Sequence, residues 1–253
     1  MKVHAVQRWL AFAALVALIL LIWAFGTDRT LKTVGRRPVR RILSPHDAGS
    51  TGGAYRGAQH WQPNATIAVE TLAESTFARC QRHTVRTESG GLVDDWLWFD
   101  ERDHVNVLVR TAADGLFVVW RQRKYGLRRE TLAPIGGFIE RAESPLEAAQ
   151  RELAEELGMR APARGWRLLG AFATSANRGG GTATLFFADG AEPAADPLAR
   201  KPTLDYEAQS SVRLSRRELL DALSAGAFQE VKWTATVALT LLSLAEGDAG
   251  GHT

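Results

Sequence analysis

The segment 144–158 carries the start and stop signals of one α-helix, and it constrains the fold more than any other part of this 253-residue chain. Ser144 is a favoured N-cap, Pro145 suits the first helical position, and Glu147 completes a capping box. Gly158 is placed to end the helix. Apolar residues at helical spacing predict a buried stripe, which consists of Leu146, Ala149, Leu153 and Leu157.

A second face of this helix holds three carboxylates, because Glu152, Glu155 and Glu156 are spaced i, i+3, i+4. Like charges at that spacing repel each other, and a solvated acidic face is the usual interpretation of such a cluster. Here a turn containing Gly136 and Gly137 precedes the helix, and clustered carboxylate oxygens suit Mg²⁺ or Mn²⁺. A bound dication would relieve the repulsion, so the pattern indicates a metal site on this helix face.

Strand and helix signals around that helix predict an α/β sandwich of roughly 180 residues. Asp114-Gly115 lies between two apolar runs, which is a strong hairpin signal. Strands are predicted at 77–86, 92–99, 105–109, 116–120, 166–173 and 182–188, and a short segment with Pro134, Gly136 and Gly137 lies at 132–139. Two further helices are predicted at 215–223 and 231–244, the second with an apolar face toward the core.

The N-terminus contains an uninterrupted apolar run of 17 residues, from Trp9 to Phe25. As a helix it would extend roughly 26 Å, slightly short of a hydrocarbon core of about 30 Å. Trp9 and Trp23 lie near its ends, as interfacial aromatic residues do. We expect a membrane anchor over 1–26, with a cleaved signal peptide or an organelle-targeting segment as alternatives.

Positive charge is concentrated next to that run. Residues 1–41 carry eight Lys or Arg and one Asp, a net charge of +7, whereas the remainder carries −4. The heavier positive flank follows the run and tends to remain cytoplasmic, so we expect a single-pass protein whose body is cytosolic. The basic segment could lie on anionic lipid or form a solvated linker over 27–66. The mildly acidic remainder does not indicate a stable nucleic-acid partner.

The string from 137 to 159, GFIERAESPLEAAQRELAEELGM, fills every defined position of the Nudix box. That box is Gly, five residues, Glu, seven residues, then Arg-Glu-apolar-x-Glu-Glu-x-Gly-apolar. Its seven fixed identities would match by chance about once in 10⁸ starting positions. The chain therefore resembles the Nudix hydrolases over 67–245. The resemblance implies a Nudix-type α/β/α sandwich with a mixed sheet, here preceded by a transmembrane helix and followed by a flexible tail, 246–253.

The resemblance also implies hydrolysis of a nucleoside diphosphate linked to another group. Glu152 and Glu156 would bind the divalent metal, Mg²⁺ or Mn²⁺, and Glu155 would be a further ligand or would handle the attacking water. The backbone carbonyl of Gly137 can also face the metal. Bound metal neutralises the diphosphate and makes water a better nucleophile.

Two further groups of residues acquire roles from the resemblance. Glu143 and Arg151 would pair and hold the loop against the helix. The stretch before the box resembles the ADP-ribose/ADP-sugar pyrophosphatases, which carry a basic, Gln-containing strand end there. Arg121, Arg123 and Lys124 are therefore candidates for contacts to the diphosphate, with an ordinary charged loop as the alternative.

Two features depart from that subgroup. It often has an acid two residues before the proline, where this chain has Leu132 before Ala133-Pro134. It also often has a glutamate base in a loop after the box, whereas 174–183 contains no acid. Asp205 or Glu207 could supply one. In the same loop, the run 178–181 (RGGG) could let the backbone approach a phosphate or form a hairpin loop.

The histidines and two tryptophans contribute less to the functional hypothesis. His60, His83 and His104 lack metal-ligand spacing and are interpreted as surface or loop residues. Trp96 and Trp98 could stack on an adenine, pack in the core, or lie at the interface of a homodimer.

The sequence therefore predicts a membrane-tethered, metal-dependent hydrolase that cleaves ADP-ribose or a related nucleoside diphosphate sugar. The products would be a nucleoside monophosphate and a sugar phosphate. One alternative is the same chemistry on a dinucleotide, a capped RNA end or an inositol pyrophosphate. Another is a catalytically silent Nudix module that binds a nucleotide at a membrane.

Overall fold

The structure, a computed structural model, describes residues 64–195 and 209–250, with side chains described up to residue 246. All of these residues belong to one of the two units of the chain, Arg41–Thr253. Within them, every helix is too short or too polar to cross a membrane. The expected anchor, 1–26, nearly all of the expected linker and His60 lie outside the described residues.

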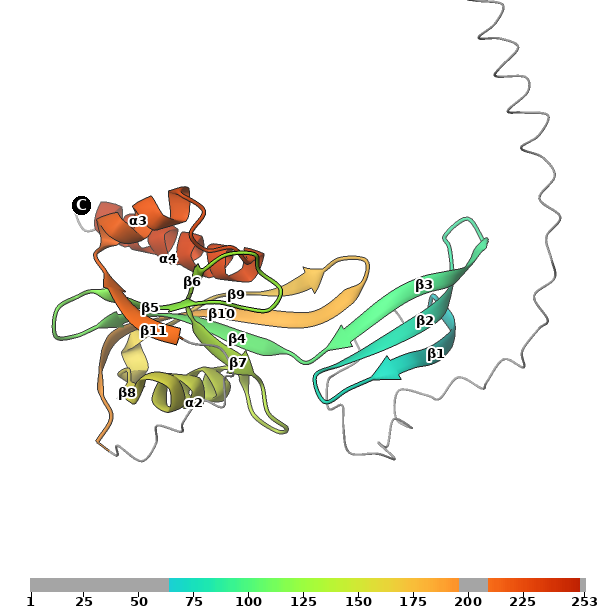
Figure 1. Cartoon of the computed structure of the whole chain (residues 1–253), viewed down its shortest axis with the longest axis horizontal. Helices are drawn as coiled ribbons and strands as arrows, with labels where there is room; N and C mark the ends of the chain where they lie inside the picture. Colours follow the sequence, from blue (N-terminus) through green and yellow to red (C-terminus); the bar gives the residue numbers. More distant parts are fainter. Residues whose placement is uncertain (1–63, 196–208, 251–253) are drawn as a thin grey trace, which may run out of the picture. The chain divides into compact units, whose positions relative to one another are not determined.

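The strands form one sheet with a mixed centre (Figure 1). Its main order is β1-β2-β3-β10-β4-β5-β11, in which β10 runs parallel to β3 and β4 while the other neighbours are antiparallel. Off this path, β6 pairs with β5, β7 with β4, and β8 and β9 with β10. The strands are β1 (Thr66–Glu74), β2 (Ala78–Arg86), β3 (Leu92–Glu101), β4 (His104–Thr111), β5 (Phe117–Gln122), β6 (Thr131–Ala133), β7 (Ile135–Phe138), β8 (Met159–Arg160), β9 (Trp166–Ser175), β10 (Gly179–Pro193) and β11 (Gln209–Leu214).

Helices cover both faces of the mixed part of the sheet, as predicted for an α/β sandwich (Figure 1). Helix α2 (Pro145–Leu157) lies on one face. Helices α3 (Arg216–Ser224) and α4 (Val231–Gly250) lie on the other. A 3₁₀ turn, η1 (Ala163–Gly165), precedes β9. Helix α4 runs six residues beyond the predicted Leu244 and into the segment expected to be a tail.

Alternation along β4 separates the core into two layers. Val105 and Val107 point toward α2 and pack with Leu153 of that helix. Leu108, on the opposite side of β4, packs with Val237 of α4. All of these side chains are fully buried. The sheet therefore presents one apolar surface to α2 and another to α3 and α4.

Helix α2 has the predicted ends. Ser144 and Glu147 form the capping box, and Gly158 caps the C-terminus in the left-handed conformation, with φ of 63°. The predicted buried stripe is wrong in one place, because Leu146 is 39% exposed and Ala148 is buried instead. Residues 144–147 are all exposed, so the first turn extends beyond the core.

The strands β1, β2 and most of β3 form the antiparallel N-terminal part of the sheet, called here the N-terminal sheet. Strand β1 was not predicted, because none of its residues is buried and no clear alternation results. A single residue pair, Gly179↔Phe99, joins β3 to β10. A Cβ on Gly179 would overlap the carbonyl oxygen of Phe99, so the glycine permits this close approach. The run 178–181 therefore belongs to the β9–β10 hairpin, but only Arg178 lies in its turn, while the three glycines that were predicted to form the loop begin strand β10.

Candidate active site

The last turn of α2 brings Glu156 against the edge of two strands. Its Oε1 accepts a hydrogen bond from the backbone N–H of Gly136 on β7, at 3.1 Å. Its Oε2 accepts one from the indole N–H of Trp120 on β5. Glu156 is therefore oriented by two donors that both belong to the sheet.

One turn earlier, Glu152 lies directly over the backbone of Gly137. A Cβ at Gly137 would overlap Oε1 of Glu152, so a side chain here would displace the carboxylate. The Glu152 side chain is only 12% exposed. This burial raises the pKa of Glu152 above its usual range, while the neighbouring guanidinium of Arg151 opposes the shift.

Arg151 connects the helix to the loop that precedes it. Its Nε and Nη2 donate to the two oxygens of Glu143, at 2.8 and 3.0 Å, which is the pairing the sequence predicted. Nη2 also donates to the carbonyl of Phe138, at 2.9 Å. Nη1 donates to Glu152 at 2.7 Å and to Glu155 at 3.2 Å. These contacts raise the pKa of Arg151 and lower that of Glu143, so both remain charged.

The donor set on α2 suits a hard dication such as Mg²⁺, since three carboxylates lie on about one helical turn beside the open backbone of Gly137. As they are placed, the described His, Cys, Asp and Glu side chains form no group of three that could hold a metal ion. Glu152 and Glu155 turn toward Arg151, and Glu156 turns toward the sheet. The residues fit the ion chemically. On binding it, Glu152 and Glu155 would replace their hydrogen bonds to Arg151 with contacts to the ion.

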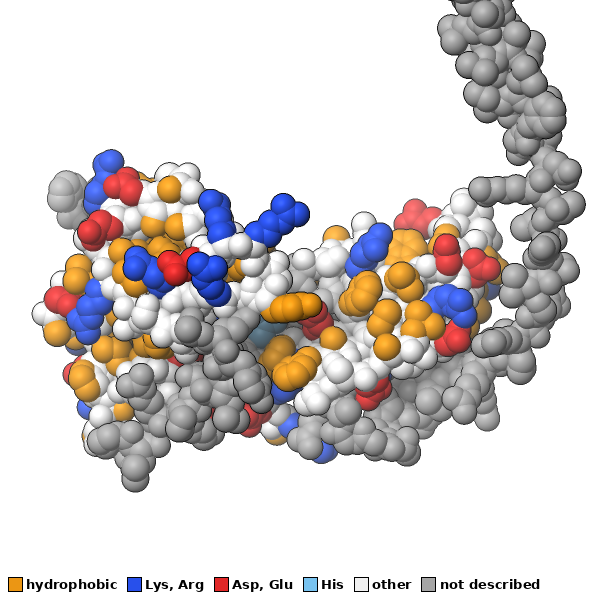
Figure 2. All heavy atoms as spheres, in the orientation of Figure 1, with side chains coloured by type: hydrophobic (Ala, Val, Ile, Leu, Met, Phe, Trp, Pro, Cys, Tyr) orange, Lys and Arg blue, Asp and Glu red, His pale blue; other side chains and the backbone are white. Residues whose placement is uncertain are grey.

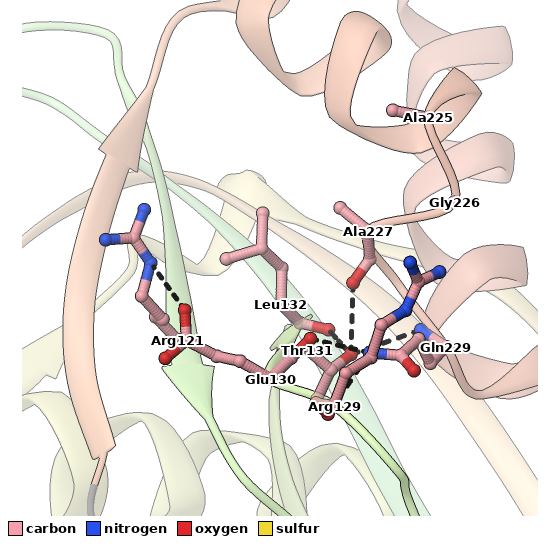
Figure 3. A pocket seen from close by; sticks show the side chains of 9 residues that line it. All are labelled: Arg121, Arg129, Glu130, Thr131, Leu132, Ala225, Gly226, Ala227 and Gln229. Atoms are coloured by element: carbon pink, nitrogen blue, oxygen red, sulfur yellow. Dashed lines mark hydrogen bonds and ion pairs between the residues drawn. The ribbon is translucent and has the colours of Figure 1, made fainter.

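The candidate substrate residues are not gathered with the carboxylates. Arg121 follows Trp120 on β5, so its side chain points to the opposite face of the sheet from α2. Figure 3 shows it facing Glu130, 3.5 Å away, at the side of a cavity of about 330 Å³. The loop between α3 and α4 lines the cavity with Ala225, Gly226, Ala227 and Gln229. Arg123 and Lys124 follow the end of β5, in the loop before β6.

Two histidine interpretations were wrong. His83 and His104 are 1% and 5% exposed and lie in strands β2 and β4, not in loops or at the surface. His83 stacks on Trp98, with ring centroids 5.6 Å apart. Trp96 donates its indole N–H to the carbonyl of Asn177, at 2.7 Å. Both tryptophans therefore contact other residues of the same chain.

Sequence reasoning did not assign any part of this site to Trp120. Residue 120 was predicted to lie in a strand, and it does, but the contact of its indole with Glu156 depends on how α2 packs on β5. One general signal was available: a buried indole N–H usually has an acceptor. In a strand rich in apolar residues, that acceptor must come from another element.

A family model described as NUDIX domain matches residues 100–234, which is more than half of the chain. No curated protein matches. Among solved structures, one described as the crystal structure of ADP compounds hydrolase is similar in fold, with a TM-score of 0.59 and 21% identity. That alignment covers 72% of this chain and 94% of the other. The box helix, the mixed sheet and the family match agree, and the chain belongs to the Nudix family of hydrolases, enzymes that act on phosphoanhydride bonds.

Proposed function

We propose that this protein hydrolyses the diphosphate of ADP-ribose or a related nucleoside diphosphate sugar, with Mg²⁺ or Mn²⁺ as cofactor. The observation that carries the proposal is the packing of Glu152 and Glu156 against Gly137 and Gly136, with Glu155 on the same helix face. The similarity to a solved ADP compounds hydrolase supports an ADP-containing substrate. The products would be a nucleoside monophosphate and a sugar phosphate.

The carboxylates of Glu152, Glu155 and Glu156 and the carbonyl of Gly137 would hold the dication. When bound, such an ion neutralises the diphosphate and lowers the pKa of bound water. The Glu155 side chain is 20% exposed, compared with 12% for Glu152, which suits the alternative role of positioning the attacking water. Arg151 and Glu143 keep the preceding loop against α2, so that the ligands sit on a rigid element.

Arg123 and Lys124 are proposed to contact the diphosphate from the loop after β5. Arg121 shares this proposal, although its pairing with Glu130 directs it to the other face of the sheet. The contributions of the three residues can be separated by replacing each with alanine and measuring KM for ADP-ribose. A rise in KM only for Arg123 and Lys124 would remove Arg121 from the substrate site.

The proposal is tested by Mg²⁺-dependent release of monophosphate from ADP-ribose by the full-length chain. Glu156→Gln should lower turnover by at least about 100-fold, since a lost metal ligand costs several kcal/mol of transition-state stabilisation. The control is Asp221→Asn, which changes an exposed carboxylate on α3 that pairs with Arg217. Equal activity of wild type and Glu156→Gln would contradict the assignment of the metal ligands.

A substrate panel decides between the alternatives. Preferred cleavage of a dinucleotide, a capped RNA end or an inositol pyrophosphate would retain the chemistry and change the substrate. Nucleotide binding without cleavage of any phosphoanhydride would identify a silent module and contradict the enzymatic proposal.

We also propose that the apolar run 9–25 tethers the protein to a membrane, with the hydrolase domain in the cytosol. Protease treatment of sealed membranes should then digest the domain from the cytosolic side. Glycosylation at Asn64, within the sequence Asn64-Ala65-Thr66, would instead place the domain in a lumen. A fully soluble full-length protein would contradict the tether.

A homodimer is proposed to form through the N-terminal sheet. Figure 2 shows hydrophobic side chains gathered over β1–β3. On one face of these strands Leu72, Leu97 and Phe99 are 47%, 40% and 42% exposed. Apolar patches of this kind mark interaction surfaces. Light scattering of the full-length chain should give twice the monomer mass, and Phe99→Asp should return it to monomer; a monomeric wild type would contradict the proposal.

A further inference from the structure

Trp120 lies under the helix that carries the glutamates. It sits on the α2 side of β5, packs in the same core layer as Leu153, and is 7% exposed. Its indole N–H donates to Oε2 of Glu156, while the N–H of Gly136 donates to Oε1. Two neighbouring elements of the sheet thus hold both oxygens of one carboxylate.

This support differs from that of the other two glutamates. Arg151, which belongs to the helix itself, donates to Glu152 and Glu155. A flexible cationic side chain can be exchanged for a dication, whereas a buried indole fixed by its packing stays where it is. Glu156 is therefore the carboxylate whose direction the sheet determines before any ion arrives.

Both oxygens of Glu156 keep the capacity to bind a cation. Each carboxylate oxygen has about two lone-pair sites, so an oxygen that accepts a hydrogen bond can also bind a cation. In metal sites generally, hydrogen bonds from outer residues orient the ligands, and removing such a partner weakens metal affinity by about 10–100-fold. The indole N–H of Trp120 is in the position of such an outer partner.

We propose that Trp120 is a positioning residue, which holds the Glu156 carboxylate in the direction in which it binds the catalytic dication. The proposal rests on the proposed function, since it assigns a role toward the same metal site. It adds that the affinity for the ion depends on an indole N–H of β5 as well as on the carboxylates of α2.

The chain offers a matched control in Trp166. It packs in the same core layer, edge-on to Phe186 at 6.1 Å, and its indole nitrogen has no hydrogen-bond partner in the described part of the chain. Trp120→Phe and Trp166→Phe therefore remove the same atoms from one layer. Only the first removes a donor to Glu156.

Mn²⁺ binding to the full-length chain should be measured by electron paramagnetic resonance, and activity on ADP-ribose should be titrated with Mn²⁺. Trp120→Phe should bind Mn²⁺ at least about tenfold more weakly and recover activity at high Mn²⁺, whereas Trp166→Phe should behave as wild type. A role in packing alone would lower thermal stability without changing Mn²⁺ affinity. Unchanged affinity in folded Trp120→Phe would overturn the inference and leave the proposed function intact.

A second measurement covers the case in which Trp120→Phe does not fold. In the ¹⁵N-labelled wild type, the indole resonance of Trp120 should shift on addition of Mg²⁺, and that of Trp166 should shift much less. No shift of Trp120 at saturating Mg²⁺ would overturn the inference. A wild type that binds neither Mn²⁺ nor Mg²⁺ would overturn both this inference and the proposed function.

Discussion

The two faces of the mixed sheet are covered by helices of opposite character. Helix α2 buries three of its 13 residues, Ala148, Ala149 and Leu153, and directs charged side chains at the strand edges. Helix α4 lies over an apolar layer, and its buried hydroxyls, Thr236 and Thr240, donate to carbonyls of their own helix. The α4 face is held mainly by this apolar layer, together with the hydrogen bond from Arg167 of β9 to the carbonyl of Ser243, whereas the α2 face depends on several hydrogen bonds between charged groups. Because α2 presents carboxylates on one face, it has fewer apolar contacts with the sheet. Its polar support comes from the capping residues at its two ends and from the hydrogen bonds of Arg151 and Trp120.

Substitutions that create a similar cavity on each face of the sheet should have the largest effects on stability, and they test the comparison directly. Leu153 of α2 and Leu219 of α3 are both fully buried. Leu→Ala at either position should lower the free energy of unfolding by about 3 kcal/mol, measured by urea denaturation. Only Leu153→Ala should also lower turnover per folded molecule, since it lies beside Glu152. Equal turnover in both variants would show that the α2 site does not depend on packing beneath it.

Acid should weaken the α4 face through His104. Burial and, to a smaller extent, Lys232 of α4 lower the pKa of His104 to about 4, against the opposing effects of the Arg102 carbonyl and Asp103. Between pH 6.5 and 4 the unfolded chain binds the proton that the folded chain excludes. Stability should therefore fall as pH decreases through that window, by about 3 kcal/mol for this residue.

Urea denaturation at pH 7 and pH 4.5 measures this dependence. His104→Gln should reduce the difference between the two pH values. Burial also lowers the pKa of His83 to about 4, so the part of the pH dependence that comes from His83 should remain in this variant. A His104→Gln variant with the full pH dependence of wild type would exclude His104 as its source.

Gly137→Ala should act on the α2 face alone. Its methyl group would overlap the Glu152 carboxylate, so the side chain must turn away from the backbone. We expect a loss of about ten- to 100-fold in kcat/KM, or roughly 1.4–2.8 kcal/mol. Thermal denaturation should change little by comparison. Wild-type kinetics would mean that Glu152 acts from another position than the one over Gly137.

Substitution of the capping serines should give the smallest effect, and these two residues are the most similar pair on the two faces of the sheet. Ser144 of α2 and Ser215 of α3 form the same capping box. Replacing either with alanine should cost about 1 kcal/mol of stability. Ser144→Ala should also reduce activity slightly, since it loosens the helix that carries the ligands, whereas Ser215→Ala should not. An activity loss in both would indicate a global rather than a local effect.

Much of this site was predictable because its signals are local. Caps, periodicity and the spacing of Glu152, Glu155 and Glu156 act within one helix, and helix α2 has the predicted bounds. The Asp114-Gly115 hairpin likewise forms between β4 and β5. Strand β11 was missed, because six residues without a buried side chain carry little signal until they pair with β5.

The sequence by itself determined the family, the carboxylate helix and the α/β class, since these depend on residue types at fixed spacings along the chain. The tertiary structure decided which way each carboxylate turns. Arg121 and Trp120 are neighbours in the chain, yet pleating sends one to the α3–α4 cavity and the other to Glu156. Which element a side chain meets depends on the strand register and on the helix that packs on that face of the sheet. Both involve residues that are far apart in the chain, so no fixed spacing in the sequence reveals them.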